Sequence, residues 1–404
     1  MIIGSDHMAS NPPPVPVIDI TPLMDSKRSP ANEHAVAQQV CNALASGGIF
    51  FAKGHGIKDA TRQRAFDDAK NFFSLGKEEK CLIPAKKGGF TRGYIGFGGE
   101  SGSNRLECKE AFSYGYPWPE EQPPENALQG PNIWPAQDIQ EDGWCQRMIE
   151  LFRLMVRVCE SVSRGVSLGL GLEDEELRTL CTGGDTISLM RLFHYFPYQN
   201  HNLEVATVSS NTDTPSNTSS STFMETLLDD RGKGGPGGGS LNSSESRAEL
   251  EKISSSPHTD WGFLTCILQD DVGGLQYKHQ GIDRWLDVPC VEDALVVNCG
   301  DYLSLFSGGK LRSPVHQVVT KGLERTSFVF FYYPSFDATL PVNKESHSSR
   351  TVQDSKMDNA STEVETCRLP TEYNTLLDLS DRVDLTQISF GEYLAMKWGG
   401  VFRE

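Results

Sequence analysis

Residues 257–265 are Pro-His-Thr-Asp-Trp-Gly-Phe-Leu-Thr, and this stretch contains the most informative pair of side chains in the chain. In a β-strand, residues i and i+2 point to the same face. His258 and Asp260 are therefore predicted to direct one imidazole and one carboxylate toward the same point. This pair suits a metal ion if a later part of the chain supplies a third ligand.

A second histidine occurs in Ser313-Pro314-Val315-His316-Gln317-Val318, which we predict to be a later strand. Two histidines and one carboxylate on one face of a metal leave three coordination positions open, as in non-haem Fe(II) oxygenases. His258 or His316 by itself would be an ordinary loop or strand histidine. The three side chains together predict a metal site because they occur in order and in strand context.

Arg325 and Ser327 form another pair at positions i and i+2, at the start of a predicted strand. Their side chains share a face of that strand. A guanidinium fork beside a hydroxyl suits a carboxylate, and hydrogen bonds to charged groups contribute roughly 1.5–3 kcal/mol each. Arg325 alone would be a surface ion pair. Its position shortly after His316 favours a carboxylate clamp next to the metal site.

The residues around these motifs alternate between strand-like runs and turn signals such as Gly273-Gly274 and Gly308-Gly309. Many short strands with regular turns are typical of a sandwich or a barrel. The runs predicted to be strands are 186–197, 261–268, 274–279, 284–288, 294–299, 302–306, 313–320 and 326–333.

The first half of the chain has helical periodicity over residues 35–44, 58–75 and 142–171, with short strands predicted at 15–20 and 49–52. Helices in front and strands behind predict an α+β fold with a mainly β core. We expect this core to be a double-stranded β-helix, or jelly roll, with flanking helices that are mostly N-terminal.

Two polar segments, 199–256 and 343–371, are rich in small polar residues and bury too little apolar surface to order themselves. We interpret them as insertions in surface loops. The expected organisation is a disordered tail at 1–14, an N-terminal helical and α+β region packed on the core at 15–180, a jelly-roll catalytic core at 181–341 with a flexible insertion at about 199–256, and a polar loop with a C-terminal helix at 342–404.

Composition narrows the class of partner. The chain has 404 residues, with 37 Lys and Arg, 54 Asp and Glu, and a formal net charge of −17, which argues against nucleic-acid and anionic-membrane partners. No apolar run of about 20 residues and no signal peptide are visible, and the ten cysteines include no CxxC pair. We expect a cytoplasmic protein that acts on a small molecule, and its oligomeric state is left open.

Several motifs have the spacing of one known family. They are His258-Thr259-Asp260, His316 and Arg325-Thr326-Ser327 for HxD…H…RxS, Asn298-Cys299-Gly300-Asp301 for NxGD, Gly48-Ile49-Phe50-Phe51 with Gly54-His55-Gly56-Ile57 for GFF…NHGI, Lys109-Glu110-Ala111-Phe112 for KE.F, and Arg191 to Pro197 for the R..(N/H)Y.P strand. In these motifs the chain resembles the Fe(II)/2-oxoglutarate-dependent oxygenases, in the branch with isopenicillin N synthase, ACC oxidase and plant flavonoid and gibberellin oxidases. It departs from the family at Gln317, where arginine is common, and in the length of the insertion 199–256.

The resemblance implies a set of roles. His258, Asp260 and His316 would be the catalytic Fe(II) ligands, and 2-oxoglutarate would chelate the metal with its far carboxylate on Arg325 and Ser327. Tyr195 would help to hold that carboxylate through its hydroxyl. Dioxygen would take the last coordination position, and ascorbate is the candidate reductant. Decarboxylation of 2-oxoglutarate would be coupled to hydroxylation, desaturation or ring closure of a small organic molecule.

Two alternatives stay open at the level of sequence. One is an Fe(II)-dependent oxidase of the same fold that does not use 2-oxoglutarate, because an Arg-x-Ser clamp holds a substrate carboxylate in such relatives. The other is a catalytically inactive jelly-roll binding protein.

Overall fold

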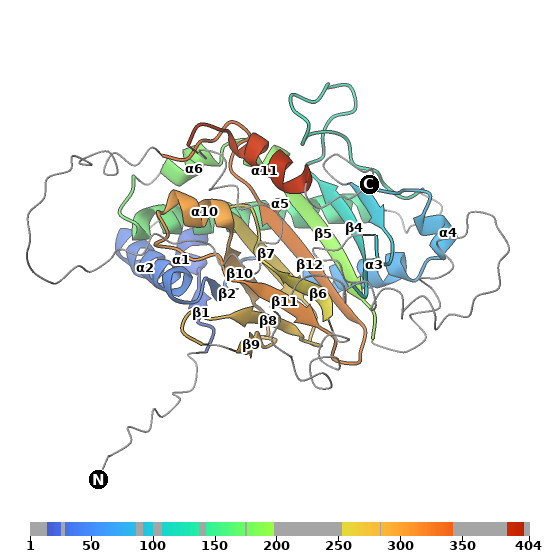
Figure 1. Cartoon of the computed structure of the whole chain (residues 1–404), viewed down its shortest axis with the longest axis horizontal. Helices are drawn as coiled ribbons and strands as arrows, with labels where there is room; N and C mark the ends of the chain where they lie inside the picture. The colour runs from blue at the N-terminus through green and yellow to red at the C-terminus, as the bar shows by residue number, and fades with distance from the viewer. Residues whose placement is uncertain are drawn as a thin grey trace, which may run out of the picture.

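The computed structural model describes residues 14–25, 29–85, 92–99, 107–136, 143–173, 176–197, 253–282, 284–341 and 386–399 (Figure 1). Within these ranges the chain forms one sheet of eight strands, one sheet of four strands and a set of flanking helices. The elements are β1 (Val17–Asp19), α1 (Thr21–Met24), α2 (Pro30–Ser46), β2 (Ile49–Lys53), α3 (Asp59–Phe73), α4 (Lys77–Lys80), β3 (Gly93–Ile95), β4 (Lys109–Gly115), α5 (Trp144–Gly169), α6 (Glu176–Leu180), η2 (Gly184–Thr186), β5 (Leu189–Tyr195), β6 (Ile253–His258), β7 (Leu264–Gln269), β8 (Leu275–Lys278), β9 (Trp285–Asp287), β10 (Leu295–Cys299), α10 (Asp301–Phe306), β11 (His316–Val319), β12 (Arg325–Tyr332) and α11 (Phe390–Gly399).

The two sheets are the faces of the predicted jelly roll. The larger has the order β1-β2-β10-β7-β12-β5-β4-β3, and the smaller has the order β6-β11-β8-β9. All described strand pairs are antiparallel except β1 with β2. Apolar residues of both sheets, including Phe193 and Ile267 from the larger and Leu275 and Val318 from the smaller, pack in one cluster between them. The α+β fold with a mainly β core is therefore confirmed.

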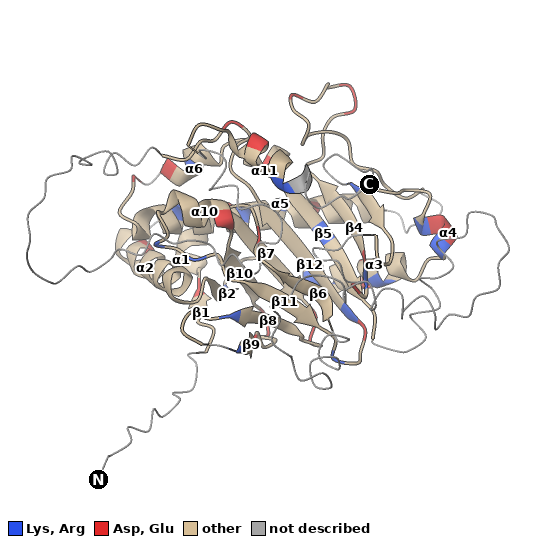
Figure 2. Ribbon diagram, in the orientation of Figure 1, with Lys and Arg blue, Asp and Glu red and all other residues tan. Residues whose placement is uncertain are grey.

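Helices cover the other face of the larger sheet. The predicted long helix is α5, whose buried stripe includes Met148, Phe152, Met155 and Val162. It packs against α2 and contacts β7 and β12, whereas α3 contacts β12. Figure 2 shows that the central strands of the larger sheet carry few charged residues, and β7 and β10 carry none. This composition fits a sheet whose two faces are both buried.

Alternation along β5 decides which side chains enter the space between the sheets. Met190 and Leu192 pack in the cluster that contains the helices, while Phe193 and Tyr195 pack in the cluster between the sheets. Arg191 has the same parity as Phe193 and Tyr195, so it shares their face. His194 lies on the opposite face, as its alternation with Tyr195 predicts, and its Nδ1 is 2.9 Å from Glu110 Oε1.

Two predictions about local structure are wrong. Residues 302–306 were expected to form a strand, but they belong to helix α10. A short apolar run has too few residues for its periodicity to separate strand from helix. Residues 253–256 were placed in the flexible insertion, but they belong to β6, where Ser254, Ser255 and Ser256 are buried. Pairing with β11 holds this serine-rich segment in a sheet, although its composition is that of a loop.

The N-terminal region does more than pack on the core, because β1, β2, β3 and β4 belong to the larger sheet itself. The predicted C-terminal helix is α11. The tail at 1–13, most of the insertion (198–252) and the loop at 342–385 lie outside the described residues. Among the described helices, none combines the length and apolar composition needed to cross a lipid bilayer.

Candidate metal centre

The side chains of His258, Asp260 and His316 converge at one end of the smaller sheet. His258 is the last residue of β6 and His316 the first of β11, and the two are direct partners across these strands. His258 Nε2 lies 3.9 Å from Asp260 Oδ1, and His316 Nε2 lies 3.7 Å from Asp260 Oδ2. One potential ligand atom from each residue lies within 4.8 Å of those of the other two. The three side chains can thus meet at a single metal ion.

The strand prediction for the His-x-Asp pair holds only for its first member. β6 ends at His258, and Asp260 lies in the loop that follows. A backbone hydrogen bond fixes this loop, because the Asp301 amide donates to the Asp260 carbonyl over 2.7 Å. The meeting of the two side chains therefore depends on a contact with α10 and not on strand alternation.

The histidines are oriented by backbone carbonyl groups. His258 Nδ1 is 2.7 Å from the Ser256 carbonyl oxygen, and His316 Nδ1 is 3.1 Å from the Pro314 carbonyl oxygen. A carbonyl oxygen only accepts, so each Nδ1 must carry the hydrogen, and each Nε2 keeps a free lone pair. This is the arrangement by which metal-binding histidines are commonly held.

Asp260 is kept ionised in a buried position. Only 4% of it is exposed, and burial opposes its ionisation. The imidazoles of His316 and His258 and hydrogen bonds from Asn298 and Thr265 outweigh this effect and hold its pKa below the ordinary value. Asn298 Nδ2 donates to Asp260 Oδ2 over 2.8 Å. The carboxylate is therefore charged and oriented at neutral pH.

His258 is neutral at the same pH. Desolvation by burial, followed by the nearby imidazole of His316, lowers its pKa to about 4, and the Asp260 carboxylate only partly compensates. A metal ion at this site would not have to displace a proton from His258 near pH 7.

The predicted carboxylate clamp lies in the same part of the fold. Arg325 is 4% exposed, its Nη1 donates to Ser327 Oγ over 3.1 Å, and its Nη2 donates to Gln269 Oε1 over 3.1 Å. Tyr195 is its partner across β5 and β12, and the guanidinium carbon lies 4.8 Å from the Tyr195 ring centroid. Tyr195 therefore contacts Arg325 through the face of its ring, whereas the sequence pointed to its hydroxyl.

A cavity of about 160 Å³ between the two sheets contains all six predicted site residues in its lining. Its walls are mostly apolar, and strands of both sheets contribute to them. The complete lining is Glu107, Lys109, Leu189, Arg191, Phe193, Tyr195, Ser255, Ser256, His258, Thr259, Asp260, Trp261, Ile267, Leu275, His316, Val318, Arg325, Ser327, Val329, Phe331 and Tyr333.

Sequence reasoning did not assign a role to three charged residues in this lining. Lys109 pairs with Glu107, with Nζ 2.6 Å from Oε2, and also lies over the Phe193 ring at 5.1 Å from its centroid. Arg191 is 5% exposed. Lys109 and Arg191 belong to motifs noted in the sequence, but a motif does not tell which of its side chains face a cavity.

Comparisons with known proteins agree on the family. The model of the non-haem dioxygenase N-terminal region, named for morphine synthesis, matches residues 15–137, and that of the 2OG-Fe(II) oxygenase superfamily matches residues 241–334. The 2-oxoglutarate-dependent dioxygenase caaD of Aspergillus niger is 27% identical, over 84% of this chain and 90% of that protein. The 2-oxoglutarate-dependent dioxygenase citB of Monascus ruber is 28% identical, over 81% and 86%.

Solved structures share the fold. T7H of Neurospora crassa, solved in complex with alpha-KG, superimposes with a TM-score of 0.64 at 20% identity, over 95% of this chain and 96% of that one. JOX2, solved with 2OG, Fe and JA, superimposes with a TM-score of 0.58 at 21% identity, over 82% and 78%.

The two-sheet core and its cluster of two histidines and one carboxylate are those of a non-haem Fe(II) oxygenase. The chain belongs to the Fe(II)/2-oxoglutarate-dependent oxygenase superfamily, since the two family models together match more than half of it. It is thus an Fe(II)- and 2-oxoglutarate-dependent dioxygenase, an oxidoreductase.

Proposed function

We propose that this enzyme binds Fe(II) through His258, Asp260 and His316, and that it binds 2-oxoglutarate with the far carboxylate against Arg325, Ser327 and Tyr195. When bound, the metal and 2-oxoglutarate supply the oxidative chemistry, in which decarboxylation of 2-oxoglutarate with dioxygen is coupled to hydroxylation, desaturation or ring closure of a small organic molecule. The protein supplies position, charge and exclusion of water.

The observation that carries this proposal is the direction of the donor atoms. Both Nδ1 atoms are engaged by backbone carbonyl groups, so both Nε2 lone pairs are available beside the ionised Asp260 carboxylate. Nitrogen and carboxylate ligands of this kind suit Fe(II) and leave open positions for other ligands.

One buried side chain of the cavity, that of Arg325, suits the far carboxylate of 2-oxoglutarate. Arg325 is buried and held by Ser327 and Gln269, and among the described residues its Nε has no hydrogen-bond partner. A buried guanidinium binds a carboxylate strongly, because charge-assisted hydrogen bonds gain strength away from water. The Tyr195 ring lies over the guanidinium and limits its orientations.

The test of this proposal is spectroscopic and anaerobic. Fe(II) and then 2-oxoglutarate are added to the metal-free protein, and the visible metal-to-ligand charge-transfer band is recorded. We expect the wild type to form the band and Arg325→Ala to lose it while retaining Fe(II). Arg284→Ala is the matched control, because Arg284 is exposed and does not line the cavity.

Other outcomes would contradict the proposal. Binding of Fe(II) without the band would favour an oxidase that does not use 2-oxoglutarate. Failure to bind Fe(II) would favour a binding protein without catalytic activity. A band that survives in Arg325→Ala would remove this residue from the 2-oxoglutarate site.

We propose that the substrate is a small molecule, because the solved relatives include T7H in complex with thymine and JOX2 in complex with JA. We propose in addition that the enzyme works in the cytoplasm, with ascorbate as its reductant and without a nucleic-acid or membrane partner. The support for this is the formal net charge of −17, which disfavours binding to nucleic acids and to anionic membranes.

A further inference from the structure

The cavity has a cationic side chain that the metal and 2-oxoglutarate sites do not use. Its lining contains three cations, Lys109, Arg191 and Arg325, and two carboxylates, Glu107 and Asp260. Glu107 is bound to Lys109, and Asp260 belongs to the metal cluster. Arg325 is assigned to 2-oxoglutarate, which leaves the function of Arg191 to be explained.

Strand register separates Arg191 from Arg325. On β5 and β12, Arg325 is paired with Tyr195, whereas Arg191 is paired with Val329. Four residues therefore separate the two arginines along the strands, which corresponds to about 13 Å at the usual rise per residue. The two arginines therefore enter the cavity wall from different positions along these strands.

In strand register Arg191 lies nearer than Arg325 to the metal loop, because its partner Val329 is four residues closer than Arg325 to Tyr333, which follows the end of β12. Tyr333 is within electrostatic range of both Arg191 and Asp260. The Tyr333 ring also packs on the backbone of that loop, since a Cβ atom added at Gly262 would lie 2.5 Å from the ring. A molecule bound against Arg191 would thus lie on the metal side of the cavity, away from the carboxylate clamp.

Several neighbours of Arg191 in the cavity wall are apolar, although its partner on β4 is Ser113. Leu189 and Phe193 flank it on the same face of β5, and Val329 and Phe331 lie beside them on β12. A guanidinium in such a wall favours a planar oxyanion that it can bind through two parallel hydrogen bonds. Its five N–H donors allow it to keep another contact while it binds a ligand.

We propose that Arg191 binds a carboxylate of the primary substrate, and that the substrate is a small organic acid with an apolar body. The acid group would pair with the guanidinium, and the apolar body would pack against Phe331 and Tyr333 beside the metal. This inference rests on the function proposed above, because it takes Arg325 to be occupied by 2-oxoglutarate.

Matched pairs of acids and amides test the proposal. 3-Phenylpropanoic acid, cinnamic acid and octanoic acid are each compared with their primary amides, which have nearly the same shape but no charge. Each is titrated anaerobically into the protein loaded with Fe(II) and 2-oxoglutarate, and the change in the charge-transfer band gives its dissociation constant. Succinate formed in air, above the rate without added compound, is the second measurement.

We expect wild-type protein to bind at least one acid about tenfold to a hundredfold more tightly than its amide, as a charge-assisted contact predicts. Arg191→Gln should lose this preference and still form the band with 2-oxoglutarate. Arg191→Lys should keep part of the preference, because it retains the charge without the fork. Arg284→Gln, at an exposed arginine outside the cavity lining, should behave as wild type.

The proposal would be overturned if the acids bound no more tightly than their amides. It would also be overturned if no acid bound while the charge-transfer band with 2-oxoglutarate still formed. The acid preference persisting unchanged in Arg191→Gln would also overturn it. If wild-type protein forms no band with 2-oxoglutarate, the proposed function itself fails. The same titration therefore separates the two failures.

Discussion

His316 and His258 face each other directly across β11 and β6, and their ring centroids are 4.3 Å apart. One histidine begins its strand and the other ends its strand, so the distance between them is set by the register of the smaller sheet. Asp260, which completes the cluster, lies in the loop after β6 and is held by the amide of Asp301, the first residue of α10. The metal centre thus lies where a sheet and a loop meet.

Removal of His316 should abolish Fe(II) binding and turnover while the fold remains. His316 lines the cavity, so His316→Ala enlarges an existing cavity and should change the melting temperature by only a few degrees. Fe(II) titration and circular dichroism measure the two effects. His279→Ala is the control, because His279 does not line the cavity. Full activity in His316→Ala would contradict the proposed ligand set.

Asn298 should control metal affinity without being a ligand. It donates to Asp260 Oδ2, and residues that orient metal ligands typically contribute 10–100-fold to affinity. We expect Asn298→Ala to weaken Fe(II) binding by about that factor and to lower the free energy of unfolding by about 1.5–3 kcal/mol, since it removes a buried hydrogen bond to a charged group. Asn42→Ala, at an exposed position of α2, is the control for both measurements. Equal Fe(II) affinity in both variants would show that Asp260 needs no such support.

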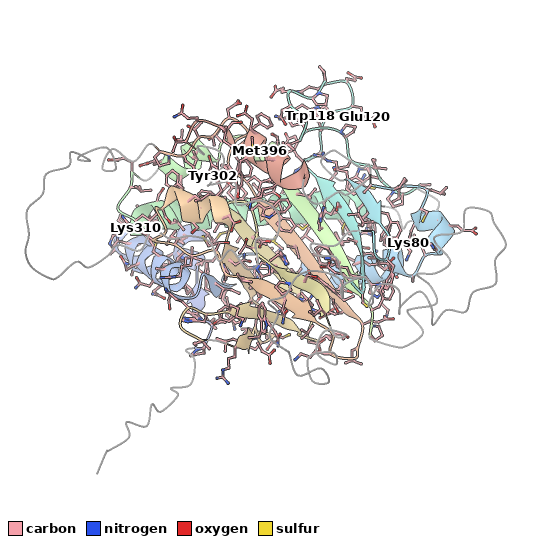
Figure 3. All side chains as sticks on the ribbon, viewed as in Figure 1. Lys80, Trp118, Glu120, Tyr302, Lys310 and Met396 are labelled. Carbon is pink, nitrogen blue, oxygen red and sulfur yellow. The ribbon has the colours of Figure 1, made fainter. Side chains whose placement is uncertain are left out.

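The C-terminal helix should stabilise the metal loop through a buried ion pair. Lys397 Nζ of α11 is 3.9 Å from Asp301 Oδ2, and the two side chains are 4% and 0% exposed. Asp301 Oδ2 also accepts a hydrogen bond from Thr259, which lies between the two residues of the His-x-Asp pair. Figure 3 shows Tyr302 of α10 beside α11, and its ring centroid is 4.9 Å from that of Phe390.

Lys397→Met would leave Asp301 buried without this cation. We expect a loss of about 3–5 kcal/mol in the free energy of unfolding, together with weaker Fe(II) binding. The double variant Lys397→Met/Asp301→Asn should recover most of the stability, since it removes the unpaired charge. Lys310→Met changes an exposed lysine near the end of α10, which Figure 3 labels, and is the control for urea unfolding. Equal stability of Lys397→Met and Lys310→Met would rule out a role for the pair.

The metal-free protein should lose stability as the pH falls from about 6.5 to about 4. In the folded state the pKa of His258 is lowered from 6.5 to about 4, so in this window the unfolded chain binds a proton that the folded chain does not. The free energy of unfolding therefore decreases with falling pH. His258→Ala should show a shallower decrease in urea unfolding between pH 4.5 and 7.5. Identical slopes would mean that His258 titrates normally.

The candidate site residues could be predicted from the His-x-Asp pair, the distal histidine and the Arg-x-Ser pair, because each motif is local and each residue type has its own chemistry. The jelly-roll class followed from the number and spacing of short strands, and the helices α2, α3 and α5 from their periodicity. Local pattern did not suffice for residues 302–306, which form α10, or for residues 253–256, which form part of β6.

The sequence by itself therefore determined the class of fold and predicted the metal-ligand types and a carboxylate clamp, since these depend on side-chain chemistry and short-range periodicity. Only the tertiary structure decided that Asp260 is placed by the Asp301 amide, that Tyr195 meets Arg325 with its ring, and that Arg191 lines the same cavity as the metal cluster. These relationships depend on the register between strands and on contacts between segments far apart in the chain. Local propensities carry no information about either, because register is set by the packing of the whole core.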